Sequence, residues 1–103
     1  MIRIRIFSIT AALPLLILGA TASFAYTGQQ YAKDAKIDLV HTRRIALQAR
    51  PGVVTDQELE REHGGSGLRY SFDIKSNGET FEVGIDAKTG RILENSKEGR
   101  NPD

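Results

Sequence analysis

The chain has 103 residues, of which 40% are hydrophobic and 26% charged, and this is enough for one folded domain. It contains no cysteine, which excludes a disulfide-stabilised fold and thiol chemistry. The formal net charge is only +1 and no basic stripe runs along the sequence, which argues against nucleic acid as a partner.

Residues 1–25 have the pattern of a secretory signal peptide. Arg3 and Arg5 precede an apolar stretch over 6–20, and residues 23–25 place small side chains at both specificity positions of a cleavage site. The alternative is an uncleaved membrane anchor, but the stretch is short for a span and contains a central proline. We therefore expect a periplasmic or secreted protein that has no membrane attachment after cleavage. Cleavage removes Arg3 and Arg5 and leaves 12 Lys plus Arg against 13 Asp plus Glu, so the net charge of the exported chain is about −1.

The first part of the exported chain changes from polar to amphipathic. Residues 26–36 are polar and show no periodicity, which predicts a flexible lead-in. Residues 37–50 predict a helix with Asp38 as its N-cap, because apolar residues recur on one stripe. That stripe consists of Leu39, Thr42, Ile45, Ala46 and Ala49. Pro51 and Gly52 end the helix, since the residue before a proline is disfavoured in the α region.

A strand and a loop follow the helix. Residues 53–62 predict a first strand with Val53 and Leu59 facing the helix. One face of this strand carries Val53, Thr55, Gln57 and Leu59, and the other carries Val54, Asp56, Glu58, Glu60 and Glu62. The glycine-rich segment 63–67 predicts a loop.

The strongest local signal predicts a β-hairpin over residues 68–86. Asn77-Gly78 stands between two alternating runs, and both residues tolerate the positive φ of a type I′ turn. The predicted register pairs Ile74 with Phe81, Phe72 with Val83, and Tyr70 with Ile85. A slip by one residue would turn all six apolar side chains to water, so this register is strongly specified.

The C-terminal stretch predicts a turn, a short strand and a tail. Asp86 begins a tight turn over 86–90, and residues 91–94 predict a final strand with Ile92 or Leu93 turned inward. Residues 96–103 are polar and predict a frayed tail. The predicted inner face of the sheet is Val53, Leu59, Leu68, Tyr70, Phe72, Ile74, Phe81, Val83 and Ile85.

These elements predict an α+β domain over 37–95, preceded by the signal peptide. One N-terminal helix packs on a three- to four-stranded antiparallel β-meander in the order α-β-β-β-β.

The run FEVGIDAKTGRIL over 81–93 resembles the most recognisable stretch of PepSY domains, V-x-[VI]-D-A-x-T-G-x-[IV]-[IL]. The resemblance covers about residues 37–95 and departs at His41, where related helices often carry an acidic residue. It implies an exported, non-enzymatic binding module that modulates or inhibits an extracytoplasmic peptidase, as in the propeptides of thermolysin-like metallopeptidases. It implies no catalytic residues and no cofactor.

The chain offers little catalytic chemistry. Its two histidines are His41 and His63, and neither has the spacing of a zinc site. Ser66 lies near His63 in the glycine-rich loop, but no carboxylate is placed to orient a triad. We expect neither an enzyme nor a metalloprotein. His63 and Ser66 are instead candidates for a loop that contacts a partner, with a plain connection as the alternative.

Acidic residues gather on the predicted outer face of the sheet. Asp56, Glu58 and Glu60 share one side of the first strand, and the hairpin register places Asp73 opposite Glu82. One interpretation is a docking face for a basic protein partner, such as a peptidase. The rival interpretation is a cation- or small-ligand-binding module. The third is a charged face that keeps the protein soluble.

The edges of such a meander expose unpaired backbone groups. An extended peptide or a second copy of the chain can add there, so we expect a monomer or an edge-paired homodimer. The alternative is an edge protected by the charges of Glu58, Glu60 and Glu62.

Overall fold

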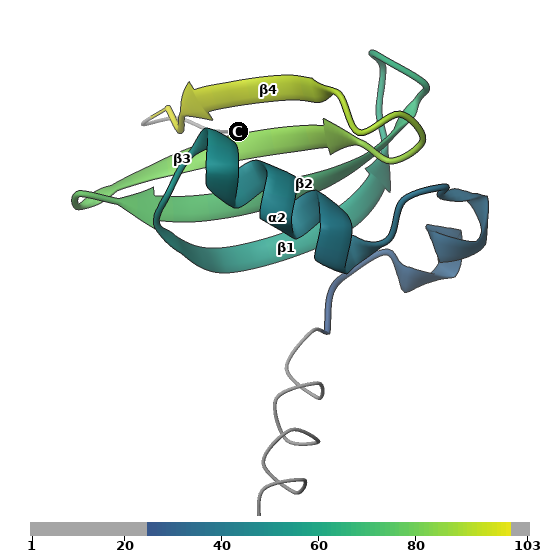
Figure 1. Cartoon of the computed structure of the whole chain (residues 1–103), viewed down its shortest axis with the longest axis horizontal. Coiled ribbons are helices and arrows are strands. Elements are labelled where there is room, and N and C mark those ends of the chain that lie inside the picture. The colour runs from purple at the N-terminus through teal and green to yellow at the C-terminus, as the bar shows by residue number, and fades with distance from the viewer. Residues whose placement is uncertain (1–24, 100–103) are drawn as a thin grey trace, which may run out of the picture.

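The computed structural model describes residues 25–99 and contains one helix packed on a four-stranded sheet (Figure 1). The elements are the 3₁₀-helix η1 (Gln29–Asp34), α2 (Leu39–Ala49), β1 (Val53–Arg61), β2 (Leu68–Ser76), β3 (Glu79–Asp86) and β4 (Ile92–Lys97). All neighbouring strands are antiparallel, in the order β1-β2-β3-β4. This confirms the predicted α+β meander. Residues 1–24 of the predicted signal peptide lie outside the described residues.

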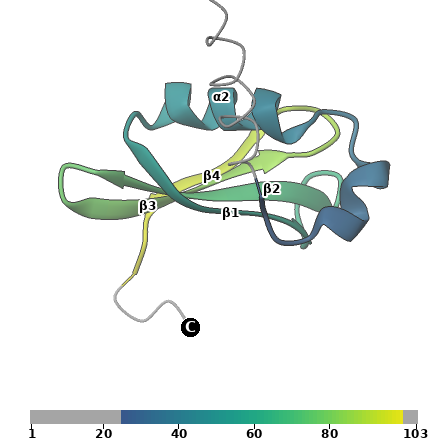
Figure 2. The same ribbon diagram turned by 90° about the horizontal axis from the view of Figure 1, so that it is seen from below.

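Among residues 25–99, the helix α2 covers one face of the sheet and no helix lies on the other face, as Figure 2 shows. Neither described helix is long and apolar enough to cross a membrane. The face under α2 is the inner face, and the opposite face is called the outer face below.

The central hairpin has the predicted register. β2 and β3 pair Ile74 with Phe81, Phe72 with Val83, and Tyr70 with Ile85. Asn77 and Gly78 have φ values of 54° and 82°, as a type I′ turn requires. Phe72 and Val83 are fully buried, so the predicted inner face forms the core.

The helix begins at Leu39 rather than at residue 37, because Asp38 takes an extended conformation and serves as the N-cap. The Asp38 carboxylate accepts a hydrogen bond from the backbone N–H of His41 at 2.9 Å. The His41 ring Nδ1 also lies 2.8 Å from the same oxygen. This contact adds to the side-chain cap but is not a capping box, in which the third helical residue accepts from the backbone N–H of the N-cap. Leu39, Thr42 and Ala46 are the buried residues of the predicted stripe.

The prediction that Val53 faces the core is wrong. A β-bulge between Val54 and Asp56 adds one residue, so the alternation reverses at the start of β1. Val54 therefore lies opposite Ile74 and packs against the core, while Val53 is 66% exposed.

The last strand is longer than predicted. β4 runs over Ile92–Lys97 instead of 91–94, and the Glu98 N–H donates to the Thr80 carbonyl at 2.9 Å. The polar side chains of this stretch suggested a frayed tail, but backbone pairing with β3 does not require apolar side chains. Leu93 is half-buried and Ile92 is 48% exposed. Residues 100–103 of the tail lie outside the described residues.

Residues 26–36, predicted as a flexible lead-in, contain regular structure. Residues 29–34 form η1, and Thr27 makes a parallel bridge to Glu58 of β1. The Leu59 N–H donates to the Thr27 carbonyl at 2.8 Å. Gly28 has a φ of 92°, and a Cβ at this position would overlap the Leu59 carbonyl oxygen. Glycine therefore allows the lead-in to approach β1 at backbone distance.

We expect Gly28→Ala to detach the lead-in from β1. Amide hydrogen exchange at Leu59 should accelerate by about tenfold or more, because its acceptor on Thr27 moves away. Gly67→Ala is the matched control, since Gly67 has nearly the same φ, 93°, but no atom near the added Cβ. Equal exchange at Leu59 in the two variants would contradict this account of the lead-in.

Candidate functional site: the outer face of the sheet

The outer face brings carboxylates from three strands into one row. The strand registers place Asp56 of β1 beside Asp73 of β2, and Asp73 beside Glu82 of β3. Glu58 and Glu60 follow along β1 on the same face, in the next two rows. Like charges directly opposite each other are unfavourable, so the carboxylates of this row repel one another. The five acidic residues predicted as a partner or cation face therefore share one side of the sheet.

Three carboxylates of this face, those of Glu60, Asp73 and Glu82, have raised pKa values and are harder to ionise than free carboxylates. Burial first, and then the charges of Glu94 and Asp73, raise the pKa of Glu82 to about 7. Burial also raises the pKa of Asp73, with further contributions from Glu98 and Asp56. The pKa of Glu60 is raised by burial as well, although a 2.7 Å hydrogen bond from the Ser71 hydroxyl opposes the shift.

Arg69 is a nearly buried cation beside these carboxylates, only 7% exposed. Its Nη2 donates to the His63 carbonyl at 3.0 Å, and its Nη1 lies 3.4 Å from Glu94. Its guanidinium is therefore directed to Glu94 and the loop rather than to the Asp73–Glu82 pair. A Cβ at Gly84 would lie 3.2 Å from Nη1, so the glycine leaves room for this side chain. A glycine within a strand often marks a place where another group approaches closely. Gly84 was therefore a sequence signal that a neighbouring side chain, here Arg69, is buried beside it.

Asp86 joins the glycine-rich loop to the β3–β4 turn. Its carboxylate is 1% exposed and accepts bonds from the Ser66 N–H at 2.6 Å and the Ser66 hydroxyl at 2.8 Å. The N–H groups of Lys88 and Thr89 donate to it at 2.8 and 3.2 Å. Burial alone would raise the pKa of Asp86, but these bonds outweigh it and lower the pKa to about 2.

The predicted partner loop is therefore partly committed to internal contacts. The Ser66 hydroxyl donates to the Asp86 carboxylate and to the Leu68 carbonyl. Within residues 25–99, no hydrogen bond joins this hydroxyl to His63. Gly67 and Gly64 are also bonded to each other within the loop. The exposed side chain of His63 stays a prediction as a contact to a partner.

Comparison with known protein families matches residues 43–95 to PepSY, described as the peptidase propeptide and YPEB domain. The chain belongs to the PepSY family. The match spans most of α2 and all of β1, β2 and β3, and it ends within β4. Neither curated proteins nor solved structures yield a match. PepSY domains are generally non-catalytic and typically extracytoplasmic, and they typically interact with proteins such as peptidases.

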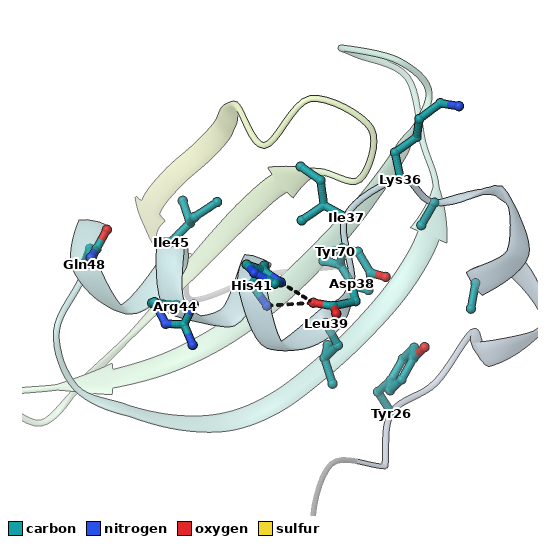
Figure 3. A pocket seen from close by; sticks show the side chains of 12 residues that line it. Tyr26, Lys36, Ile37, Asp38, Leu39, His41, Arg44, Ile45, Gln48 and Tyr70 are labelled. Carbon is teal, nitrogen blue, oxygen red and sulfur yellow. Dashed lines mark hydrogen bonds and ion pairs between the residues drawn. The ribbon is translucent and has the colours of Figure 1, made fainter.

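A hollow of about 640 Å³ lies over the N-terminal half of α2 in this PepSY domain (Figure 3). Its walls are mainly apolar and come from Tyr26, Ile37, Ile45 and Tyr70. Burial, and next the neighbouring Tyr26, raise the pKa of Tyr70 to about 12, so its phenol stays neutral. The hollow was not predicted because the lead-in that supplies Tyr26 was expected to be irregular.

The acidic face does not have the form of a metal site. Over residues 25–99, no three or more His, Cys, Asp or Glu side chains are grouped so that they could hold a metal ion. The carboxylates lie in a row along the pleated surface rather than around a common centre. The cation-binding interpretation therefore gains no support from these residues.

Proposed function

We propose that this protein is an exported, non-catalytic module that restrains a peptidase by docking the outer face of its sheet on a basic surface of that enzyme. The observation that carries the proposal is the Asp56–Asp73–Glu82 row in a member of the peptidase-propeptide family. This row lies on a face that no helix of the described part of the chain covers.

The row favours a cationic partner for an electrostatic reason. Three adjacent carboxylates repel one another, and a Lys or Arg side chain placed between them relieves that repulsion. The basic partner also favours the ionised form of Glu82, whose pKa is raised to about 7 by burial first and by neighbouring carboxylates next. Docking therefore releases protons near neutral pH, and binding strengthens as the pH rises through this range.

We expect the purified protein to inhibit a thermolysin-type metallopeptidase, more strongly at about pH 8 than at about pH 6. Removing two charges of the row with Asp73→Asn and Glu82→Gln should weaken inhibition by about tenfold or more and reduce its salt dependence. Measured inhibition constants across pH and salt concentration test this.

Glu79→Gln is the matched control. It removes a carboxylate from the end of the hairpin, where Glu79 pairs with Lys97 at 3.0 Å, outside the row. This variant should inhibit like the wild type. Absence of inhibition by the wild type, or equal weakening by Glu79→Gln, would contradict the proposal.

A further inference from the structure

The two edges of the sheet differ in what covers them. The backbone of Thr27 bonds to the edge of β1 that lies away from β2. Its carbonyl accepts from the Leu59 N–H at 2.8 Å, and its N–H donates to the Gln57 carbonyl at 3.5 Å. Farther along the same edge, Arg61 forms an ion pair with Asp34 of η1 at 2.7 Å. The lead-in thus lies on this edge, for which protection by the charges of Glu58, Glu60 and Glu62 was the alternative to strand addition.

The edge of β4 that lies away from β3 has no paired segment in the described part of the chain. The Glu98 N–H donates to Thr80 of β3, and hydrogen bonds alternate along an antiparallel strand. Ser96 and Glu94 therefore direct their backbone groups to β3, whereas Asn95 and Lys97 direct theirs to the open edge. The edge offers a short row of free donors and acceptors.

We propose that β4 pairs antiparallel with β4 of a second copy, forming a two-fold dimer with one continuous eight-stranded sheet. A head-to-tail assembly needs the β1 edge as the acceptor, but Thr27 of the lead-in bonds to Gln57 and Leu59 in the middle of that edge and interrupts it. Within residues 25–99 the β4 edge has no such interruption, and two identical edges meet as a closed, symmetric pair.

Charge selects one register for this pair. The outward backbone groups of Asn95 and Lys97 allow three registers between the two copies. Asn95 can lie opposite Asn95 of the second copy, Asn95 can lie opposite Lys97, or Lys97 can lie opposite Lys97. The second register sets Glu94 against Glu98, and the third sets Lys97 against its own copy, so both place like charges opposite each other. The first register sets Glu94 against Ser96 and contains no like-charge pair. The two-fold axis therefore passes beside Asn95.

The helix side of the edge is compatible with this axis. Arg50 donates to the Asn95 side chain at 3.1 Å, while its guanidinium carbon lies 3.8 Å above the Phe81 ring. Phe81 belongs to β3, so this charge is set back by one strand from the edge. The two guanidinium groups of a dimer would be separated by about three strand spacings, or about 14 Å, where salt screens their repulsion.

Cysteine crosslinking tests the register, because the chain contains no natural cysteine. In the proposed dimer the two Asn95 Cα atoms lie about 5.5 Å apart, within the span of a disulfide. The two Ser96 Cα atoms are about 8 Å apart, beyond that span. Asn95→Cys should therefore form a covalent dimer with oxidised glutathione, which accepts the electrons and is released as reduced glutathione, at least about tenfold faster than Ser96→Cys.

Light scattering of the cysteine-free protein tests the pairing itself. The mass should rise from one chain towards two with increasing concentration. Asn95→Pro removes the outward N–H at the axis and should abolish this rise, whereas Asn95→Ala keeps the N–H and should retain it. Circular dichroism establishes that both variants are folded.

Several results would overturn the inference. These are a mass of one chain up to millimolar concentration, dimerisation of folded Asn95→Pro, or equal crosslinking of the two cysteine variants. None of them depends on whether the protein inhibits a peptidase, so this inference and the proposed function fail separately.

Discussion

Replacing Asp86 by asparagine is expected to lower the free energy of unfolding by about 3 kcal/mol. The carboxylate is almost fully buried and accepts four hydrogen bonds, two of them from Ser66. An amide retains one acceptor oxygen, but its NH₂ group would face the Ser66 N–H, donor against donor. Loss of the negative charge also removes the charge-assisted strength of the remaining bonds. The glycine-rich loop and the β3–β4 turn then lose their common anchor.

Denaturant unfolding at neutral pH measures this cost. Asp73→Asn is the matched control, because it makes the same chemical change on the outer face, where burial raises the pKa of Asp73 instead of lowering it. We expect this control to leave stability unchanged or to raise it. Similar losses in the two variants would show that Asp86 has no special structural role.

The acid dependence of stability provides a second test of Asp86. Hydrogen bonds hold the pKa of the folded state at about 2, below the ordinary value of 3.8 in the unfolded chain, against the opposing effect of burial. The stabilisation from Asp86 is therefore complete above about pH 4 and is lost as the pH falls through about 2. The wild type should lose its stability advantage over Asp86→Asn across this range.

The second large effect is a gain of stability in Glu82→Gln at about pH 8. The pKa of Glu82 is raised from 4.5 to about 7, by burial first and then by Glu94 and Asp73, so the folded state binds the proton more tightly than the unfolded chain. The corresponding stabilisation is complete below pH 4.5 and is lost as the pH rises through 7. The neutral amide avoids this loss, and we expect a gain of about 1–2 kcal/mol after allowance for solvent screening.

Melting temperatures between about pH 5 and pH 8 measure this effect. The wild type should melt several degrees lower at the higher pH, while Glu82→Gln should show a much smaller difference. Glu79→Gln, at the exposed end of the hairpin, should keep the wild-type pH profile. A variant Glu82→Gln with the same pH dependence as the wild type would contradict the electrostatic account of the acidic row.

Together, the two carboxylates define a limited window of greatest stability. Asp86 destabilises the fold when it is protonated, whereas Glu82 destabilises it when it is ionised. We therefore expect maximal stability between about pH 4 and pH 6. The acidic face thus costs stability at neutral pH, which is consistent with a surface kept for binding.

Local pattern alone determined the central part of this protein. Asn77-Gly78 between two alternating runs specified the turn, and the turn specified the pairing of residues 69–76 of β2 with residues 79–86 of β3. The same alternation placed Asp73 opposite Glu82, so this central pair of the acidic row followed from the sequence alone. The N-cap role of Asp38 also followed from its position before the apolar stripe.

Tertiary contacts decided the rest, because the deciding partner lies far away in the sequence. The bulge that exposes Val53 depends on pairing with β2, and the lead-in becomes ordered only against the edge of β1. Ser66 and Asp86 are separated by 20 residues, so no local pattern indicates that the loop hydroxyl serves an internal carboxylate. Local side-chain patterns specify turns and register over a few residues. Burial and edge pairing instead depend on contacts with backbone segments that are distant in the sequence.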